Sequence, residues 1–366
     1  MKKILTVVGA RPQFIKAAVV NREIRKRADV EEIIIHTGQH YDYNMSEQFF
    51  RELDIMTPNY NLDVKGDNLG IQTGVMIKKI SEILKRESPD FLMVYGDTTS
   101  TLAGAVAAVG NKIPVVHVEA GVRSYDFNMP EEINRMMTDK IAKVLFLPVE
   151  SAKETLRKEG VFDNNHYLQK LVFAGDVMYD ATLYYKKKAD NIIDSVLEIN
   201  SIKDKFVLAT IHRAANVDDE ERLRKIVDIL DTVSQKVQVV LPLHPRTKKQ
   251  LNKLGLMFKN VTVTEPLSYL ETIALEGRSI AVITDSGGVQ REAFFLNKPC
   301  LIVRDRSEWT DLINNKFAVI TDLDSSLILK MIDDIISLDY VYPKDNRNIF
   351  GNGDAGKIIV DTLSSL

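Results

Sequence analysis

The chain has very little cysteine: Cys300 is the only one among 366 residues, so no internal disulfide can form. Apolar runs are short as well, and none approaches the roughly 20 residues that a membrane-spanning helix needs. Charge of one sign is also lacking, because 48 basic and 51 acidic residues leave a formal charge of -3. These absences exclude a disulfide scaffold and predict no membrane and no nucleic-acid partner. The N-terminus turns polar too soon for a signal peptide, so we expect a cytoplasmic protein.

What the chain does contain is a regular alternation of short β-branched runs and longer helical patterns. Their apolar residues are consecutive, which is typical of strands covered by helices on both faces of a parallel sheet. The first series of predicted strands is Ile4–Val8, Glu32–Thr37, Phe91–Tyr95, Val115–Val118 and Val144–Leu147. The second series is Phe206–Ile211, Val237–Leu243, Val261–Thr264, Ile280–Thr284, Cys300–Val303 and Phe317–Ile320. The pattern predicts an α/β protein with two doubly wound parallel sheets, the second domain beginning near residues 170–176.

Polar side chains gather where the predicted strands end. Five of the six histidines lie there, namely His36, His40, His117, His212 and His244. One such histidine is more often a structural hydrogen-bonding group. Ligands of parallel sheets bind outside the carboxyl ends of the strands, so five histidines from both sheets favour a site.

Two turns that lead from a strand into a helix are candidate phosphate sites. In residues 9–12, Arg11 stands at the expected helix N-terminus, where free N–H groups and the helix dipole attract anions. Residues 284–288 are the stronger candidate because two glycines let a ligand approach the backbone, although Asp285 and Ser286 could merely cap the helix. Neither turn matches a dinucleotide motif or a P-loop, which disfavours NAD chemistry and ATP hydrolysis.

Acidic motifs form the third candidate element: GDTTSTLAG with Asp97, HVEAGVRS with Glu119, and MPEEINR with Glu131 and Glu132. Carboxylates buried near one another and near cations can hold different protonation states, as an acid and a base on one substrate require. Asp97 could instead cap the helix that follows it. The sequence has no H-E-x-x-H motif and no cysteine pair, so no metal is expected.

Together these motifs resemble the non-hydrolysing UDP-N-acetylglucosamine 2-epimerases. The segments in the family's order are GARPQFIKAA, HTGQHYDYNM, GDTTSTLAG, HVEAGVRS, MPEEINR, TIHRA, HPRT, TDSGGVQREA and FGNG, and they span almost the whole chain. The resemblance implies a GT-B-like fold, two Rossmann-like domains facing a cleft, with the last helix returning to the first domain. We therefore expect a first domain of residues 1–170 plus 353–366 and a UDP-binding domain of residues 171–352.

The resemblance also implies a reaction. UDP leaves a UDP-linked 2-acetamido sugar as C2 loses its proton, and UDP adds back to the resulting 2-acetamidoglucal after the configuration at C2 is inverted. It implies no cofactor, a UDP-sugar as the partner, and a homodimer. The catalytic candidates at matching positions are Asp97, Glu119, Glu131 and His212, of which His212 also looks like a UDP ligand. The candidates that bind substrate or UDP are Arg11, Lys16, Arg135, His244, Ser286, Gly287, Gly288 and Glu292.

Two positions depart from the family pattern. Ala215 stands where a glutamate is usual, and Glu308 is followed by Trp309 where an arginine is common. Trp309 is either a packing residue or part of an altered sugar recognition; with RPQFIK at 11–16 it looks more like the branch acting on UDP-2,3-diacetamido-2,3-dideoxyglucuronate. Three alternatives stay open: a hydrolysing 2-epimerase, a GT-B glycosyltransferase, and a non-catalytic regulator that binds UDP-sugar.

Overall fold

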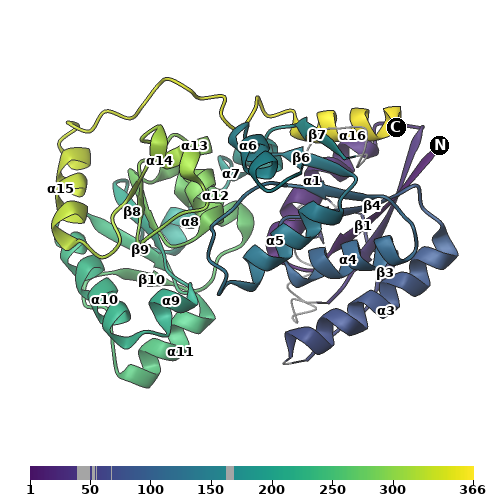
Figure 1. Cartoon of the computed structure of the whole chain (residues 1–366). Helices are drawn as coiled ribbons and strands as arrows, with labels where there is room; N and C mark the ends of the chain where they lie inside the picture. Colours follow the sequence, from purple (N-terminus) through teal and green to yellow (C-terminus); the bar gives the residue numbers. More distant parts are fainter. Residues whose placement is uncertain (39–49, 52–53, 55, 67, 162–168) are drawn as a thin grey trace. The chain divides into compact units, whose positions relative to one another are not determined.

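The computed structural model describes the chain except residues 39–49, 52–53, 55, 67 and 162–168 (Figure 1). His40 and most of the HTGQHYDYNM motif lie outside the described residues. The chain forms two compact units: unit 1 comprises Met1–Ala181 and Asn348–Leu366, and unit 2 comprises Thr182–Arg347. The division falls later along the chain than the expected residue 170, because the strand that begins there pairs with the sheet of unit 1.

Unit 1 is built on a seven-stranded parallel sheet of order β3-β2-β1-β4-β5-β6-β7. The strands are β1 (Lys2–Val8), β2 (Val30–His36), β3 (Tyr60–Asn61), β4 (Phe91–Tyr95), β5 (Val115–Val118), β6 (Val144–Leu147) and β7 (Lys170–Phe173). Its helices are α1 (Arg11–Ile24), α3 (Leu69–Glu87), α4 (Thr99–Gly110), α5 (Pro130–Ile141), α6 (Ser151–Lys158), the start of α7 (Val177–Ala189) and α16 (Ala355–Ser365). Every residue of β4, β5 and β6 is buried, as helices on both faces require.

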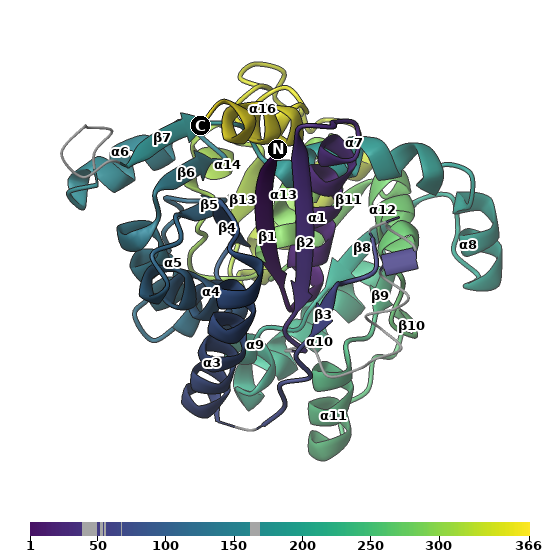
Figure 2. The same ribbon diagram turned by 90° about the vertical axis from the view of Figure 1, so that its right-hand side faces the viewer.

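The last helix, α16, packs against α1 (Figure 2). The approach is close: a Cβ added at Gly356 would lie 2.6 Å from Val19. On the α7 side, Asp180 accepts a hydrogen bond from the Gly356 N–H at 2.9 Å. Helix α16, at the C-terminus, therefore belongs to the same layer of helices as α1, at the beginning of the chain.

Unit 2 is built on a six-stranded parallel sheet of order β10-β9-β8-β11-β12-β13. The strands are β8 (Phe206–Thr210), β9 (Gln238–Pro242), β10 (Thr262–Thr264), β11 (Ala281–Thr284), β12 (Cys300–Ile302) and β13 (Ala318–Ile320). Its helices after α7 are α8 (Ile193–Ile199), α9 (Ala214–Val217), α10 (Glu220–Ser234), α11 (Pro245–Leu254), α12 (Tyr269–Arg278), α13 (Gly287–Phe295), α14 (Thr310–Asn314) and α15 (Ser325–Ile336). Their apolar faces close over the sheet around Val207, Leu241 and Ile283, which are fully buried.

The predicted strands are confirmed to within about two residues at each end, and so is the predicted fold class of two doubly wound parallel sheets. The short edge strand β3 has no β-branched run and was not predicted, and β7, which lies at the predicted domain boundary, was not among the predicted strands.

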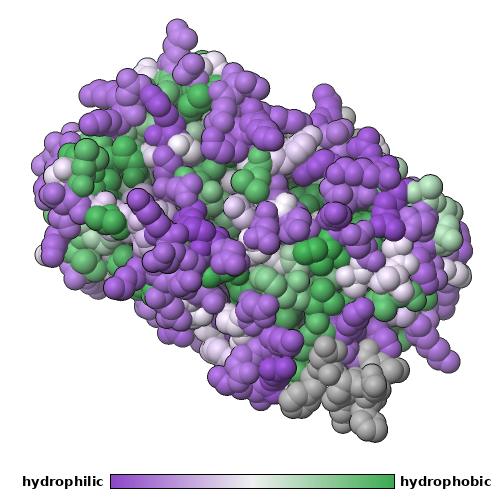
Figure 3. All heavy atoms as spheres, turned by 90° about the horizontal axis from the view of Figure 1, so that it is seen from above, coloured by the Kyte–Doolittle hydropathy of each residue, from purple (hydrophilic) through white to green (hydrophobic). Residues whose placement is uncertain are grey.

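Polar residues cover most of the face that Figure 3 shows, and apolar residues gather there in smaller patches. Within the described part of the chain, no helix combines the length and the apolar character needed to cross a membrane.

Candidate active site

A buried ion pair marks the carboxyl end of the unit 1 sheet. Lys16 on α1 lies 2.8 Å from Glu119, which follows β5, and both side chains are only 5% exposed. Glu119 has a φ of +71°, a left-handed conformation that costs a non-glycine residue energy and that the surrounding contacts must maintain. Gly96 at the end of β4 leaves room for the pair, because a Cβ there would lie 2.9 Å from Lys16 Nζ.

Asp97 follows Gly96 and does not cap the next helix. Thr98 is the N-cap of α4 and accepts a hydrogen bond from the Thr101 N–H. The Asp97 carboxylate instead pairs with the guanidinium of Arg135 on α5. The capping alternative that the sequence left open for Asp97 is thereby replaced by an ion pair.

The neighbouring glutamates of α5 differ in their surroundings. Glu131 is exposed, and it takes no part in the ion pairs that the described residues form at this edge. Glu132 is fully buried and accepts hydrogen bonds from the Ser124 N–H and hydroxyl at 2.9 Å, and it lies 3.1 Å from Arg135. Arg135 therefore stands between the carboxylates of Asp97 and Glu132.

The first candidate phosphate turn is largely filled by its own helix. The side-chain oxygen of Gln13 accepts hydrogen bonds from the N–H groups of Gly9 and Ala10 at 2.8 and 3.1 Å. Gln13 also donates to the Tyr95 carbonyl at 3.0 Å. These backbone groups are not free for an anion, which corrects our reading of this turn as a cradle of free N–H groups. Arg11 stands at the beginning of α1, and its guanidinium stays a candidate for binding an anion.

In unit 2, a buried aspartate organises the loop that carries His212. Asp285 is fully buried and accepts hydrogen bonds from the N–H groups of His212, at 3.1 Å, and Arg213, at 3.0 Å. Asn216 on α9 donates to the same carboxylate at 3.1 Å. The imidazole of His212 stays 39% exposed, with its Nδ1 atom 3.5 Å from Asp285. Ala215, the first departure from the family pattern, is exposed on α9.

His244 lies beside His212, with their ring centroids 5.4 Å apart. It is the N-cap of α11, and its Nδ1 atom accepts a hydrogen bond from the Arg246 N–H at 3.1 Å. Since Nδ1 accepts there, the remaining ring nitrogen, Nε2, is the one that can donate to a ligand.

The second candidate phosphate turn keeps an uncapped helix N-terminus. Ser286 is the N-cap of α13 but makes no side-chain cap hydrogen bond, and the Asp285 carboxylate serves the His212 loop instead. The capping alternative therefore does not account for this turn. A Cβ added at Gly288 would meet only the Ser286 hydroxyl, at 3.8 Å, so the space beside it is open. Free N–H groups, a helix dipole and open space are what an anion such as a diphosphate requires.

Trp309 is buried beside this turn. It is 3% exposed, and the guanidinium of Arg291 lies 4.0 Å from the centroid of its ring. The preceding Glu308 pairs with Arg304 at 2.9 Å, and its carboxylate would collide with a Cβ at Gly287. Glu292, the residue expected on the ribose, is 5% exposed in α13. Trp309 therefore packs within the protein while it adjoins the beginning of α13.

Several polar residues of the unit 1 site were not expected from the sequence: Gln13, Arg123, Asn134 and Asp139. Their partners lie far away along the chain, so spacing gives no signal for them.

Cys300 is buried in β12, where burial raises the pKa of its thiol and disfavours a nucleophilic thiolate. No group of three or more metal-ligating side chains occurs among the residues that the structure describes.

The fold and the site define a class of protein. Two doubly wound sheets, an open helix N-terminus for an anion in one, and buried carboxylates paired with cations in the other are typical of an enzyme that handles a phosphorylated substrate by acid–base chemistry.

Comparisons with known proteins show which family within this class the chain resembles. The family model for UDP-N-acetylglucosamine 2-epimerase matches residues 22–364. The UDP-2,3-diacetamido-2,3-dideoxy-D-glucuronate 2-epimerase of Pseudomonas aeruginosa is 44% identical, and so is a UDP-N-acetylglucosamine 2-epimerase homolog of Methanococcus maripaludis; the matches cover 100% of each chain. A crystal structure of the Methanocaldococcus jannaschii UDP-GlcNAc 2-epimerase with UDP-GlcNAc and UDP superposes with a TM-score of 0.90 at 38% identity, covering 100% of both chains.

The chain therefore belongs to the UDP-N-acetylglucosamine 2-epimerase family and is an epimerase, which is a kind of isomerase. This confirms the family that the motifs indicated.

Proposed function

We propose that the enzyme is a non-hydrolysing epimerase that inverts C2 of a UDP-linked 2-acetamido sugar. In the first step a base takes the C2 proton, the C1–O bond breaks with its electron pair leaving on UDP, and a C1–C2 double bond forms. The second step reverses these changes with the proton delivered to the opposite face. The observation that carries this proposal is the placement of two ion pairs at one sheet edge, the buried pair of Lys16 with Glu119 and the partly buried pair of Arg135 with Asp97.

The two carboxylates suit the proton transfers for a physical reason. Each is held by a cation that restrains its side chain, so little reorganisation is needed in the transition state. A developing charge in such a buried site is stabilised more strongly than in water. Asp97 and Glu119 are thus the principal acid and base candidates, and Glu131 remains a third.

The nucleotide is assigned to unit 2. The uncapped N-terminus of α13 at Ser286, Gly287 and Gly288 suits the diphosphate, and the exposed imidazole of His212 suits a donor to the same group. His244 and Glu292 complete the proposed UDP ligands. Arg11 and Lys16 of unit 1 are also proposed to bind the substrate.

For the sugar, we propose UDP-2,3-diacetamido-2,3-dideoxyglucuronate as the preferred substrate. The support is the 44% identity to the Pseudomonas aeruginosa enzyme named for that sugar, above the 38% to the enzyme crystallised with UDP-GlcNAc. Trp309 is buried against Arg291 beside the turn before α13. It would therefore affect sugar recognition through the shape of that turn and not by direct contact of its ring with the sugar. UDP-N-acetylglucosamine is the second candidate, supported by the TM-score of 0.90 to that crystal structure.

The reaction type is tested by incubating the purified enzyme with each UDP-sugar in heavy water and following C1 and C2 by NMR. Deuterium at C2 with an intact UDP linkage is the expected result. Release of the free sugar and UDP would instead identify a hydrolysing epimerase, and binding without exchange would identify a regulator.

The sugar preference is tested by measuring kcat/KM for both substrates in parallel. One differential contact is worth roughly 1–3 kcal/mol, so the preference for the uronate should be roughly 10- to 200-fold. Trp309→Arg should reduce that preference, whereas Trp309→Phe, which keeps an aromatic ring on Arg291, should retain most of it. Equal turnover of UDP-N-acetylglucosamine and the uronate by the unmodified enzyme would contradict this assignment.

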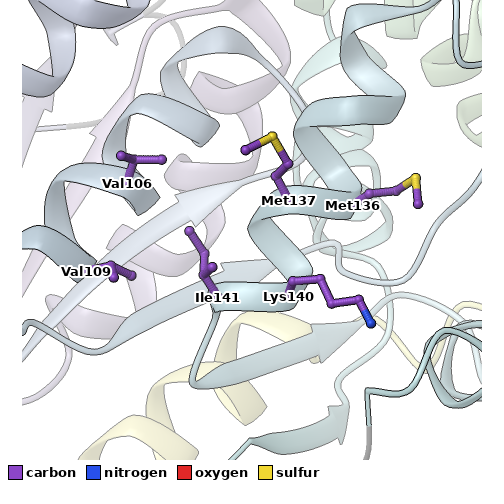
Figure 4. A pocket seen from close by; sticks show the side chains of 6 residues that line it. All are labelled: Val106, Val109, Met136, Met137, Lys140 and Ile141. Carbon is purple, nitrogen blue, oxygen red and sulfur yellow. The ribbon is translucent and has the colours of Figure 1, made fainter.

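We also propose that the enzyme is a homodimer that works in the cytoplasm. The outer faces of α3, α4 and α5 expose apolar side chains, with Ile71 at 69%, Val109 at 48% and Met137 at 47% exposure. Between α4 and α5 lies a hollow of about 420 Å³, where Met137 and Ile141 face Val106 and Val109 (Figure 4). An apolar surface of this kind is typical of an interface.

Multi-angle light scattering tests the dimer. Met137→Lys should shift the mass toward that of the monomer, and Met257→Lys, at an exposed methionine of unit 2, is the matched control. A monomeric wild-type protein would exclude the dimer.

A further inference from the structure

His117 on β5 faces a hydrogen-bond acceptor at each ring nitrogen. The side chain is fully buried, with Nδ1 2.7 Å from a carboxylate oxygen of Asp139 and Nε2 2.7 Å from the carbonyl oxygen of Gly96. A carbonyl oxygen can only accept, and so can an ionised carboxylate. A neutral imidazole could donate to only one of the two acceptors, whereas an imidazolium donates to both.

The surroundings of Asp139 agree with an imidazolium at His117. Its carboxylate also accepts a hydrogen bond from the Gly121 N–H at 3.1 Å and lies 2.7 Å from a guanidinium nitrogen of Arg123. Burial alone would raise the pKa of Asp139, but His117 and Arg123 together hold it below its ordinary value. Arg123 in turn makes two hydrogen bonds to Glu159, at 2.9 and 2.8 Å. Two cations and two anions thus compensate each other inside unit 1.

The position of His117 connects this charged cluster to the candidate acid and base. The carbonyl that it holds belongs to Gly96, the residue directly before Asp97. Gly96 has a φ of +61°, and its N–H donates to the carbonyl of Val118, the residue directly before Glu119, at 2.9 Å. The His117 side chain and this backbone hydrogen bond therefore tie the loop that carries Asp97 to β5, the strand that Glu119 follows.

Helix α5 secures the same loop from its other side. Asn134 donates to the carbonyl of Asp97 at 2.9 Å, and Asp139 extends from the helix to His117. With both carbonyls of the Gly96–Asp97 segment held, the backbone cannot rotate without breaking a buried hydrogen bond, which costs roughly 1–3 kcal/mol.

We infer that His117, kept as an imidazolium by Asp139, is a positioning residue that fixes the separation between the carboxylates of Asp97 and Glu119. It does not meet the substrate, because it is fully buried. This inference rests on the proposed function in one respect only, that these two carboxylates transfer the protons. The protonation state of His117 is inferred from its hydrogen bonds and does not depend on that function.

The kinetic test uses His117→Gln and Asp139→Asn in the full-length enzyme. Glutamine can donate to Gly96 or contact Asp139 but cannot reproduce both bonds in the same geometry. A misplacement of catalytic groups by a fraction of an ångström to 1 Å is expected to lower kcat roughly 10- to 100-fold, with UDP affinity by calorimetry within about 3-fold. An unchanged kcat in both variants would overturn the inference.

The matched control is Glu32→Gln, which also alters a buried group of the same sheet. Glu32 accepts hydrogen bonds from Thr6 and Asn21 at 2.5 and 2.7 Å and contacts neither carboxylate of the candidate site. Its kcat should stay within about 2-fold of wild type even if its melting temperature falls. An equal loss of kcat in Glu32→Gln would show that any buried defect in the sheet has this effect and would overturn the positioning role.

The spectroscopic test is independent of activity. Nitrogen-15 spectra of histidine-labelled enzyme, with His117 assigned from His117→Gln, should show that both ring nitrogens of His117 are protonated. A His117 ring with only one protonated nitrogen would overturn the inference while leaving the proposed epimerase reaction intact. Absence of C2 exchange in the wild-type enzyme would overturn the proposed function while leaving the imidazolium in place.

Discussion

The two units have similar sheets but different groups at the carboxyl ends of their strands: ion-paired carboxylates in unit 1 and an uncapped helix N-terminus in unit 2. In unit 1 the carboxylates of Glu119 and Asp97 are paired with Lys16 and Arg135, so the charged groups are held by one another. In unit 2 the buried Asp285 accepts hydrogen bonds from backbone N–H groups, and Ser286, the N-cap of α13, makes no side-chain cap hydrogen bond. Groups that move protons must be fixed in advance, whereas an anion site must leave its donors unfilled until the ligand arrives. The two roles that we propose for the units therefore depend on the side chains at the strand ends and not on the fold, which is similar in both units.

The largest effect should come from removing the charged groups of unit 1. Asp97→Asn and Glu119→Gln should each lower kcat by about 10²-fold or more and leave UDP affinity within a few fold, because proton-transfer groups act mainly in the transition state. The measurements are a rate and a calorimetric titration for each variant. Glu131→Gln belongs in the same series, and a loss only in that variant would move the acid–base role away from the paired carboxylates.

Substitutions in the unit 2 site should instead weaken UDP binding. Gly288→Val should weaken UDP binding by at least about 10-fold, which is 1.4 kcal/mol, since its side chain enters the open space beside the helix N-terminus. Gly277→Val on α12 is the control, because a Cβ there meets nothing within 4 Å and one at Gly288 meets only the Ser286 hydroxyl, at 3.8 Å. Arg11→Ala, which removes a cation in unit 1, tests the same diphosphate. Unchanged affinity in both Gly288→Val and Arg11→Ala would place the diphosphate elsewhere.

Asp180 in unit 1 belongs to neither of the two ion pairs of the candidate site, and its pKa predicts how stability depends on pH. Burial, with Asp176 and Asp354 nearby, raises the pKa of Asp180 to about 6. The folded protein then holds this proton more tightly than the unfolded chain, whose aspartates titrate near pH 3.9, so stability falls as the pH rises from about 4 to about 6. Asp180→Asn should therefore be more stable than wild type at pH 7 by about 1–2 kcal/mol and lose that pH dependence.

Denaturant unfolding at about pH 4.5 and about pH 7 measures this difference. Asp204→Asn, at a side chain that is 85% exposed, serves as the control and should change stability little. If Asp180→Asn proved less stable at pH 7, the hydrogen bond from the Gly356 N–H would outweigh the cost of burying the charge.

The smallest effect is expected at Thr98, the N-cap of α4, and it distinguishes the role of Thr98 from that of Asp97, the catalytic candidate beside it. Thr98→Ala should cost about 1 kcal/mol of stability, because it removes the acceptor of the Thr101 N–H, with kcat reduced far less than in Asp97→Asn. Thr98→Ser keeps the hydroxyl and should restore the stability. Thermal unfolding and one rate measurement per variant are sufficient, and a 10²-fold loss of kcat in Thr98→Ala would mean that the cap itself positions Asp97.

The residues that the sequence identified and those that it missed differ in a physical way. Asp97, Glu119 and Gly288 stand at strand ends, and the order of apolar runs is enough to locate strand ends in a parallel sheet. Asp139 and Gln13 lie inside helices whose patterns give no sign of their partners, His117 and Tyr95. Such pairs join residues that are distant along the chain, and a single sequence carries no record of them.

The amino-acid sequence by itself determined the two parallel sheets, most of their strands and the family, because periodic apolar runs and local motifs are written residue by residue. Only the tertiary structure decided that Thr98 rather than Asp97 caps α4, that Gln13 fills the first turn, and that Trp309 is buried. Each of these outcomes depends on which groups meet across the fold, where a buried donor or charge takes whichever partner the packing brings within reach.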